Sequence, residues 1–320
     1  MDKKQAQIEK NRAYNRERKY QAKLMKRDLN REKFLQSLYQ TGYDRIQNQI
    51  DTFYMRYADQ NGLSKAEAMK IANEMDITKF NEKAAKAVRE KDFSPDTNRW
   101  LKVYNLKMKV SRLELLKAEL ALEMQSMHAE MSDVFDKERF DELVREYKKQ
   151  AGILGVSTRS LPRTYQAILA ADFYGQKFSA RVWGKNGLHD TMQKEVFASL
   201  NRIYTDMMGF KQERKHLMKR FSVSRYQADR LLKTEIGRIN SDTDKKFYNE
   251  HDFTHVIYVA EPGACHICAP LNNNAIPIDE IEQGVNYPLM HPNCRCSTYG
   301  HIKMEYKAGG STLDEYEVYK

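Results

Sequence analysis

Side chains that bind metal ions are concentrated in one short stretch of the sequence. Cys265 and Cys268 form a C-x-x-C pair, His291 and Cys294 follow with the same spacing, and Cys296 stands two residues further on. These are all four cysteines of the 320 residues. A tight turn lets two such donors converge on one tetrahedral ion, and a second pair closes the coordination shell. The spacing therefore predicts a metal site.

Five candidate ligands compete for the four positions of a tetrahedral site. We predict structural zinc held by Cys265, Cys268, Cys294 and one of His291 or Cys296. The surrounding sequence has few apolar residues and cannot build a large core, so metal binding would supply folding free energy. A closed site of this kind leaves no open coordination position, and we expect it to have no catalytic role.

Other chemistry remains open for the same residues. The cysteines could form disulfides in an oxidising medium, or stay reduced and pack as small apolar groups. Cys265 and His291 could form a nucleophilic dyad. The C-x-x-C could be a redox pair, but no βαβ pattern surrounds this motif. The sequence contains no phosphate-binding glycine loop, H-E-x-x-H motif or nucleophile elbow. We therefore expect that the protein is not an enzyme.

Short strands are predicted on either side of these residues. Residues 255–260 are rich in β-branched and aromatic side chains, which favours a strand, and Glu261-Pro262-Gly263 turns the chain towards Cys265. Residues 276–278 and 299–304 are the next strand candidates. The predicted ligands thus lie in the loops of a small β-containing unit.

The sequence before residue 250 indicates helices, since only 14 glycines and 7 prolines occur in the whole chain. Apolar residues recur every three or four positions from Phe34 to Tyr57 and from Asp96 to Met131. Ser222 or Ser224 is the expected N-cap of a later helix. That helix carries Thr234-Glu235 with Arg230 and Arg238, and we interpret this group as an ion pair that positions the metal-bearing unit.

The predicted fold class is mainly α, within α+β: elongated helical N-terminal and central regions, followed by a small C-terminal β-containing unit stapled by zinc. We divide the chain into five segments by composition and periodicity. They are a basic helical arm (1–36), a helical region (37–150), a second helical region (151–250), a small β unit with the Cys/His cluster (251–308) and an acidic tail (309–320).

Positive charge is the main compositional feature. The formal net charge is +10, and residues 1–36 contain twelve Lys/Arg against five Asp/Glu. Such an arm could contact double-stranded DNA or another polyanion, or be a solvated helix that orders in an assembly. No apolar run approaches the roughly 18 residues of a membrane span. The first residues lack the apolar segment of a signal peptide, so we expect synthesis in the cytoplasm.

The order of several motifs resembles a known family. The segments are Phe178-Ser179-x-Arg181-x-Trp183, then Arg230-x-x-x-Thr234-Glu235-x-x-Arg238-x-Asn240, then the C-x-x-C and finally His291-Pro292-Asn293-Cys294-Arg295-Cys296. Together, over roughly residues 165–300, they resemble the head-morphogenesis or minor head (minor capsid) proteins of tailed bacteriophages, which include the F protein of phage Mu. The family often has a glycine after the second cysteine. Here Leu271-Asn272-Asn273-Asn274 stands instead, and asparagine tolerates the same left-handed turn.

The resemblance implies a structural protein of the virion. Members of this family sit in few copies inside the procapsid near the portal, and some enter the host with the DNA. The implied partners are the portal protein, scaffolding or major capsid protein, and packaged double-stranded DNA through the basic N-terminal region. The implied roles are head assembly and DNA packaging or ejection, with the protein in the host cytoplasm during assembly and in the phage head afterwards.

Two alternatives from other classes remain. The first is a metal-dependent enzyme or toxin-like effector delivered with phage DNA, because family members are sometimes fused to toxin domains. The second is a zinc-dependent DNA-binding regulator, which the long sequence separation between the basic arm and the cysteines disfavours. An open coordination position beside perturbed carboxylates would favour the enzyme.

Overall fold

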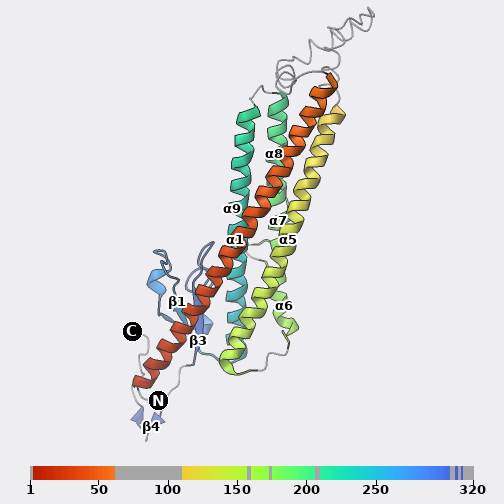
Figure 1. The fold of residues 1–320 in the computed structure, drawn as a ribbon. Coiled ribbons are helices and arrows are strands. Elements are labelled where there is room, and N and C mark those ends of the chain that lie inside the picture. Colours follow the sequence, from red (N-terminus) through yellow and green to blue (C-terminus); the bar gives the residue numbers. More distant parts are fainter. Residues whose placement is uncertain are drawn as a thin grey trace, which may run out of the picture. The chain divides into compact units, whose positions relative to one another are not determined.

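The computed structural model describes residues 3–61, 110–156, 160–172, 175–205, 210–302, 307–308 and 311–312. Its helices are α1 (Lys3–Asn61), α5 (Val110–Leu154), α6 (Arg163–Ala170), α7 (Phe178–Trp183), α8 (Leu188–Thr205) and α9 (Phe210–Glu250) (Figure 1). The strands are β1 (His255–Val259), β2 (Ala275–Pro277), β3 (Ser297–His301), β4 (Lys307–Ala308) and β5 (Ser311–Thr312). The predicted fold class, mainly helical with a small C-terminal β unit, is confirmed.

The contacts divide the chain into two compact units, and the long helices contribute to both. The first unit comprises Met1–Phe34, Ser132–Phe178 and Gln227–Lys320, and the second comprises Leu35–Met131 and Ser179–Tyr226. All five predicted metal ligands belong to the first unit. The five segments proposed from composition stay predictions about domain organisation, and the acidic tail falls largely outside the described residues.

A three-stranded antiparallel sheet forms the β part of the first unit, in the order β2-β1-β3. His255 pairs with Pro277 on one side and with His301 on the other. Helix α1 covers one face of this sheet, where Ala13 and Tyr14 pack against a cluster of β1 and β3 side chains. Arg18 Nη1 and Gln21 Nε2 of α1 donate to the carbonyls that end β1, at 2.7 and 2.9 Å.

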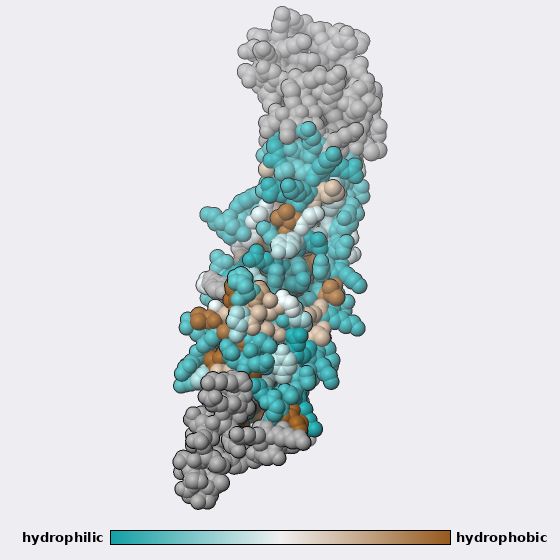
Figure 2. Space-filling model, turned by 90° about the vertical axis from the view of Figure 1, so that its left-hand side faces the viewer, coloured by the Kyte–Doolittle hydropathy of each residue, from teal (hydrophilic) through white to brown (hydrophobic). Residues whose placement is uncertain are grey.

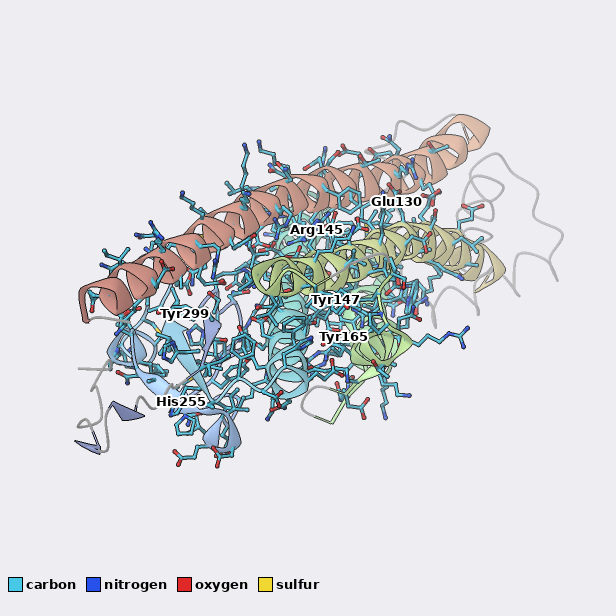
Figure 3. The ribbon with its side chains drawn as sticks, turned by 90° about the horizontal axis from the view of Figure 1, so that it is seen from below. Glu130, Arg145, Tyr147, Tyr165, His255 and Tyr299 are labelled. Carbon is cyan, nitrogen blue, oxygen red and sulfur yellow. The ribbon has the colours of Figure 1, made fainter. Side chains whose placement is uncertain are left out.

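The hydrophobic core of the first unit joins helices to the metal-ligand loops. Its buried members come from α5, α6, α9, strands β1 and β2, and the loops between β1 and β3. Tyr147 and Tyr165 meet with ring centroids 4.8 Å apart, and both are labelled in Figure 3. Cys268, Cys294 and Cys296 are themselves members of this core. The loops are thus packed against an extensive helical surface. They contribute Ile281, Tyr287, Leu289 and Met290 to the core, more apolar side chains than the sequence prediction allowed for.

A buried ammonium group lies at the centre of a charged network in the first unit. Lys149 of α5 is 4% exposed and pairs with Glu17 at 3.1 Å, with Glu146, and with Asp244 at 3.9 Å. Burial lowers the pKa of Lys149, but the three carboxylates outweigh it and raise that pKa well above its ordinary value. The ammonium therefore stays charged, and it links α1, α5 and α9.

The second unit is built from apolar helix faces. The buried side chains of α1 continue the stripe predicted from Phe34 onwards, and those of α5 follow the seam predicted to end at Met131. They are Leu35, Leu38, Tyr39, Tyr43, Ile46 and Ile50, with Leu116, Leu120, Met124, Met127 and Met131. Both periodicity predictions are confirmed where the structure describes the side chains, and residues 53–57 and 96–115 lie outside that part.

One helix boundary was predicted wrongly. Helix α9 begins at Phe210 and runs without interruption to Glu250, so Ser222 and Ser224 lie inside it and cap nothing. Ser222 Oγ donates to the Met218 carbonyl four residues back, and Ser224 Oγ donates to the Tyr39 hydroxyl. Serine hydroxyls within a helix often bond in these ways, which the sequence pattern alone does not distinguish from capping.

The surface of the described residues is largely polar. The face in Figure 2 is mainly hydrophilic, with apolar side chains scattered over it. None of the described helices combines the length and apolar character that crossing a membrane requires.

Replacing Lys149 with methionine should destabilise the protein strongly. The substitution leaves Glu17, Glu146 and Asp244 buried without their cation, and such losses cost about 3–5 kcal/mol of unfolding free energy. Urea denaturation followed by circular dichroism measures the change. The neighbouring Lys148 is exposed, so Lys148→Met should alter the unfolding free energy by less than about 0.5 kcal/mol. Equal effects from the two substitutions would contradict a central role for the buried network.

Candidate metal centre

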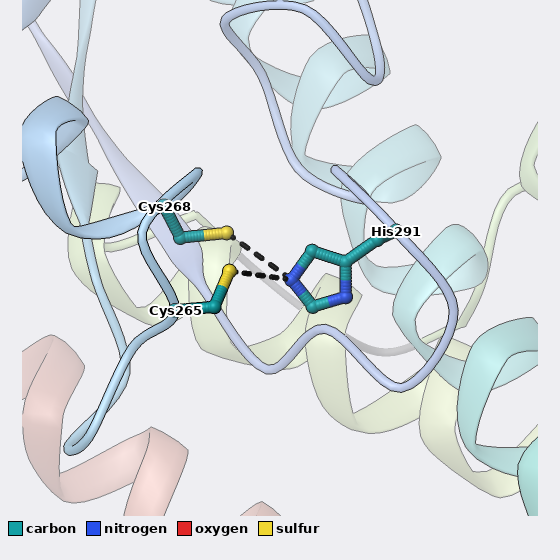
Figure 4. A group of neighbouring side chains, drawn as sticks. All are labelled: Cys265, Cys268 and His291. Atoms are coloured by element: carbon teal, nitrogen blue, oxygen red, sulfur yellow. Dashed lines mark hydrogen bonds between the residues drawn. The ribbon is translucent and has the colours of Figure 1, made fainter.

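The first pair of ligands lies on a tight turn immediately after β1. Gly263 has φ +75°, a conformation that glycine adopts without strain. The Cys265 carbonyl then accepts hydrogen bonds from the backbone N–H groups of Cys268 and Ala269, at 3.1 and 2.9 Å. A short 3-10 helix, Ala269–Leu271, follows. This turn holds both thiols towards His291 (Figure 4).

The second pair is held by a similar turn. The backbone N–H of Cys294 donates to the His291 carbonyl at 3.1 Å. Asn293, between them, has φ +67°, and Asn273, after the C-x-x-C, has the same value. Asparagine adopts this region more readily than other non-glycine residues. The sequence prediction that asparagine replaces the turn glycine after the C-x-x-C is therefore confirmed at Asn273.

The donor atoms stand at distances that suit a tetrahedral ion. His291 Nε2 is 3.2 Å from Cys265 Sγ and 3.4 Å from Cys268 Sγ (Figure 4), and Cys268 Sγ is 3.9 Å from Cys294 Sγ. A tetrahedral zinc with ordinary bond lengths separates sulfur from nitrogen by about 3.5 Å and sulfur from sulfur by about 3.8 Å. The residues present therefore fit a metal ion bound by thiolates and one imidazole.

The five candidates form two overlapping groups that share Cys268. Cys265, Cys268 and His291 lie within 4.8 Å of one another, and so do Cys268, Cys294 and Cys296. None of the four cysteines forms a disulfide. Cys268 Sγ and Cys294 Sγ, for example, lie 3.9 Å apart, whereas the two sulfurs of a disulfide are about 2.05 Å apart. All five predicted residues are thus brought together. His301 instead pairs with His255 across the sheet.

Cys296 differs from the other cysteines in the hydrogen bonds that it makes. Its sulfur accepts the backbone N–H of Glu261 at 3.4 Å. A hydrogen bond from the Cys296 thiol lowers the pKa of Cys294 to about 5, so Cys294 is a thiolate at neutral pH. The same hydrogen bond raises the pKa of Cys296, and burial raises that of Cys268 to about 12. Cys296 supports its neighbour as a hydrogen-bond donor.

The orientation of the imidazole is fixed from the opposite side. His291 Nδ1 lies 3.0 Å from the Pro292 carbonyl, which only a protonated Nδ1 can bond. This hydrogen bond leaves Nε2 facing the two thiols. A carbonyl or carboxylate on the second ring nitrogen is the usual partner of a metal-binding histidine, because it fixes the tautomer and raises the basicity of the ligand.

Arg295 anchors the second turn to the helices. Its Nε donates to Asp28 of α1 at 2.5 Å, and its Nη1 donates to the Lys233 carbonyl of α9 at 2.7 Å. Its backbone N–H donates to the Glu261 carboxylate at 3.1 Å, which joins the two ligand turns. The guanidinium is 5% exposed. The arginine between the last two cysteines therefore binds both helices and the first turn.

The Thr234-Glu235 motif contacts the same segment. The Thr234 hydroxyl accepts the backbone N–H of Asn293 at 3.3 Å and donates to the Arg230 carbonyl at 2.6 Å. Nearby, a Cβ on Gly237 would lie 2.8 Å from Leu289 Cδ1 and 3.4 Å from the Cys294 carbonyl. The motif and the glycine thus allow α9 to lie directly against the ligand turn.

Glu235 makes ion pairs with one of the two arginines of the motif, Arg238, but not with Arg230. It binds Arg238 at 2.8 Å and Arg139 of α5 at 2.9 Å. These two arginines donate to the Ile168 and Leu169 carbonyls near the end of α6. The predicted structural ion pair exists, but Arg139 takes the place expected for Arg230.

Sequence reasoning missed several positioning residues. Asp28, Arg139 and Gly237 were assigned no role, and Glu261 was assigned only to a turn. The side-chain hydrogen bonds of Asp28, Arg139 and Glu261 join residues 267, 96 and 34 positions apart, and Gly237 contacts Leu289, which is also distant in the sequence. The one available signal was Arg295 itself, since an arginine flanked by two cysteines in a buried segment requires an acidic partner. Nothing in the sequence indicates which acid.

One known protein family matches part of the chain. Residues 205–299 match the family model described as Phage Mu protein F like protein. This part of the chain is similar to phage Mu protein F. The F-like region contains α9 with its Thr234-Glu235 motif and all five metal-ligand candidates, whereas Phe178–Trp183 precedes it. The match confirms the resemblance to the phage head-morphogenesis family. No curated protein and no solved structure shows a significant match to the chain.

A methyl group on Gly237 should weaken the docking of the ligand turn. Gly237→Ala places a Cβ against Leu289, and such overpacking costs about 1–3 kcal/mol, more than alanine gains in helix propensity. The matched control is Gly152→Ala in α5, where a Cβ meets nothing within 4 Å. That substitution should be neutral or stabilise by up to about 1 kcal/mol. Chemical denaturation compares the two, and a stabilised Gly237→Ala protein would refute the close contact.

Proposed function

We propose that this protein is a structural minor head protein of a tailed phage, located inside the head near the portal. The observation that carries the proposal is the phage Mu protein F-like match over residues 205–299, which contain the complete ligand cluster. The match supports a phage head-related protein. Portal binding, scaffolding or capsid contacts, and roles in DNA packaging or ejection follow from the resemblance and form part of the proposal.

The proposed role of the cluster is structural rather than catalytic. Four donors, Cys265, Cys268, His291 and Cys294, would fill a tetrahedral zinc shell and leave no position for substrate. The donors lie on two turns that Arg295 and Thr234 hold against helices, which suits a staple between the β unit and the helical part. A catalytic zinc in an enzyme or delivered effector would instead need an open position.

Location in the head can be tested directly. Heads and complete particles purified from a producing host should contain the chain at low copy number, detected by quantitative mass spectrometry. In particles partly disassembled by chelator or denaturant, it should remain with the portal-containing fraction. Absence from particles at every stage of assembly would refute the proposal. Presence only in the host cytoplasm would favour a delivered or regulatory protein over a structural one.

The proposed ligand set predicts different effects for two cysteines. Cys265→Ser should lower bound zinc from about one equivalent to near zero and disorder the β unit, because a missing thiolate opens the tetrahedral shell. Cys296→Ser should retain the zinc, because its hydroxyl can still donate to Cys294. Elemental analysis by mass spectrometry gives the stoichiometry, and near-ultraviolet circular dichroism reports tertiary packing.

The outcome distinguishes the possible fourth ligands. Zinc lost from the Cys296→Ser protein and kept by a His291→Ala protein would assign the fourth position to Cys296 and contradict the proposed set. Purified wild-type protein without any bound metal, folded equally well with and without chelator, would refute the staple itself.

A further inference from the structure

The first half of α1 sorts its charges between two faces. Glu17 and Asp28 lie on the buried face, where they bind Lys149 and Arg295. The cations on the opposite side are exposed, and they are Arg12, Arg16, Lys19, Lys23, Lys26 and Lys33. Nitrogen-tipped side chains project from this outer side of α1 in Figure 3. The net charge of the arm is therefore presented on one side of the helix.

The spacing of these cations makes a continuous basic face. At 100° per residue, the six side chains fall within an arc of about 100°, and no acidic residue between Arg12 and Lys33 falls within it. From Arg12 to Lys33 the helix rises about 32 Å, close to one turn of B-form DNA. Within the described part of the chain, no carboxylate pairs with Arg16, Lys19, Lys26 or Lys33, and the Arg12–Glu9 pair is exposed.

The basic face continues across a hollow onto α5. A cavity of about 380 Å³ within the first unit is lined by Lys23 and Arg27 of α1 and by Arg145 and Lys148 of α5, together with the carboxylates of Glu17, Glu142, Glu146 and Asp244. Lys148 is exposed beside it. A second hollow, lined by Arg12, Asn15, Arg16, Lys19, Tyr20 and Lys23, lies along α1 alone. The lysines on the two sides of the larger cavity, Lys23 and Lys148, are exposed, whereas Arg27 and Arg145 both pair with the buried Glu142.

The chemistry of this face suits phosphates better than a protein partner. Interfaces between proteins usually have a core of aromatic and apolar residues with few charges, whereas Leu29 is the one large exposed apolar residue on α1 between Arg12 and Lys33. Long, flexible cations are typical of contacts to the DNA backbone.

We infer that this face, Arg12 to Lys33 of α1 with Lys148 of α5, binds the sugar–phosphate backbone of double-stranded DNA without sequence preference. The choice of double-stranded DNA as the polyanion rests on the proposed function in a phage head. The buried face of the same helix holds the sheet and the metal-ligand turns, so one helix connects the F-like region to the nucleic acid.

Salt dependence gives the decisive test. Fluorescence anisotropy with labelled duplexes of about 24 base pairs and two unrelated sequences should give equal affinities that fall steeply between about 50 and 200 mM salt. Combining Arg16→Gln, Lys19→Gln and Lys23→Gln should weaken binding at least about tenfold at low salt and reduce the salt slope by about 2–3. These side chains are exposed, so the triple variant should keep the wild-type circular dichroism spectrum.

A matched control removes the same charge elsewhere in the first unit. Lys137, Lys177 and Lys245 are exposed on other elements, and their combined replacement by glutamine should change affinity less than about twofold. Equal loss in both variants would show that net charge rather than this face binds DNA, and would overturn the inference. Binding to polyglutamate but not to duplex DNA would also overturn it, in favour of an acidic protein partner.

The inference and the proposed function can fail separately. The triple variant should still enter phage heads, because the F-like region is unchanged. A wild-type protein that is present in heads but binds no duplex would refute the DNA-binding face alone. A protein that binds duplex DNA through this face but is absent from heads would refute the proposed function alone.

Discussion

The buried guanidinium of Arg295 is the interaction on which the first unit depends. It lies between two cysteines, and it is held by Asp28 of α1, by a carbonyl of α9 and through its backbone by Glu261. These contacts connect residues 267 positions apart in the chain. A buried charge is tolerated only when paired and hydrogen-bonded, so the arginine requires all its partners at once. The position of the ligand turns is therefore coupled to that of α1.

Two kinds of interaction compensate for the small size of the β unit. Its three strands are short, so the sheet itself buries little apolar surface, although the loops add Ile281, Tyr287, Leu289 and Met290 to the core. Paired charges around Lys149 and Arg295 fix how the helices meet the loops, and a metal ion would join the two turns. Buried ion pairs contribute little net stability compared with apolar packing, but they penalise alternative arrangements. We infer that this unit is organised for a defined geometry.

The sequence allowed much of the local structure to be predicted, and little of the long-range pairing. Periodicity identified the buried faces of Leu35–Ile50 and Leu120–Met131, since a helix repeats every 3.6 residues whatever it packs against. The C-x-x-C and H-x-x-C spacings identified four of the clustered residues, because ligand convergence is a local property of two turns, and Cys296 follows two residues after the second pair. The choice of Arg139 over Arg230 as partner of Glu235 depends on how α5 meets α9, which no local pattern encodes. Ser222 and Ser224 were wrongly predicted to cap a helix, because the local sequence does not distinguish a capping serine from a serine inside a helix.

The central claim is that the F-like region is stapled by a closed site of three thiolates and one imidazole. X-ray absorption spectroscopy at the zinc edge, on protein purified from its producing host, tests this most directly. The account predicts three sulfur neighbours at about 2.3 Å and one nitrogen at about 2.0–2.1 Å, with no exchangeable water. A shell of four sulfurs would replace His291 by Cys296. Two or more light-atom neighbours with bound water would indicate an open site and contradict the structural role.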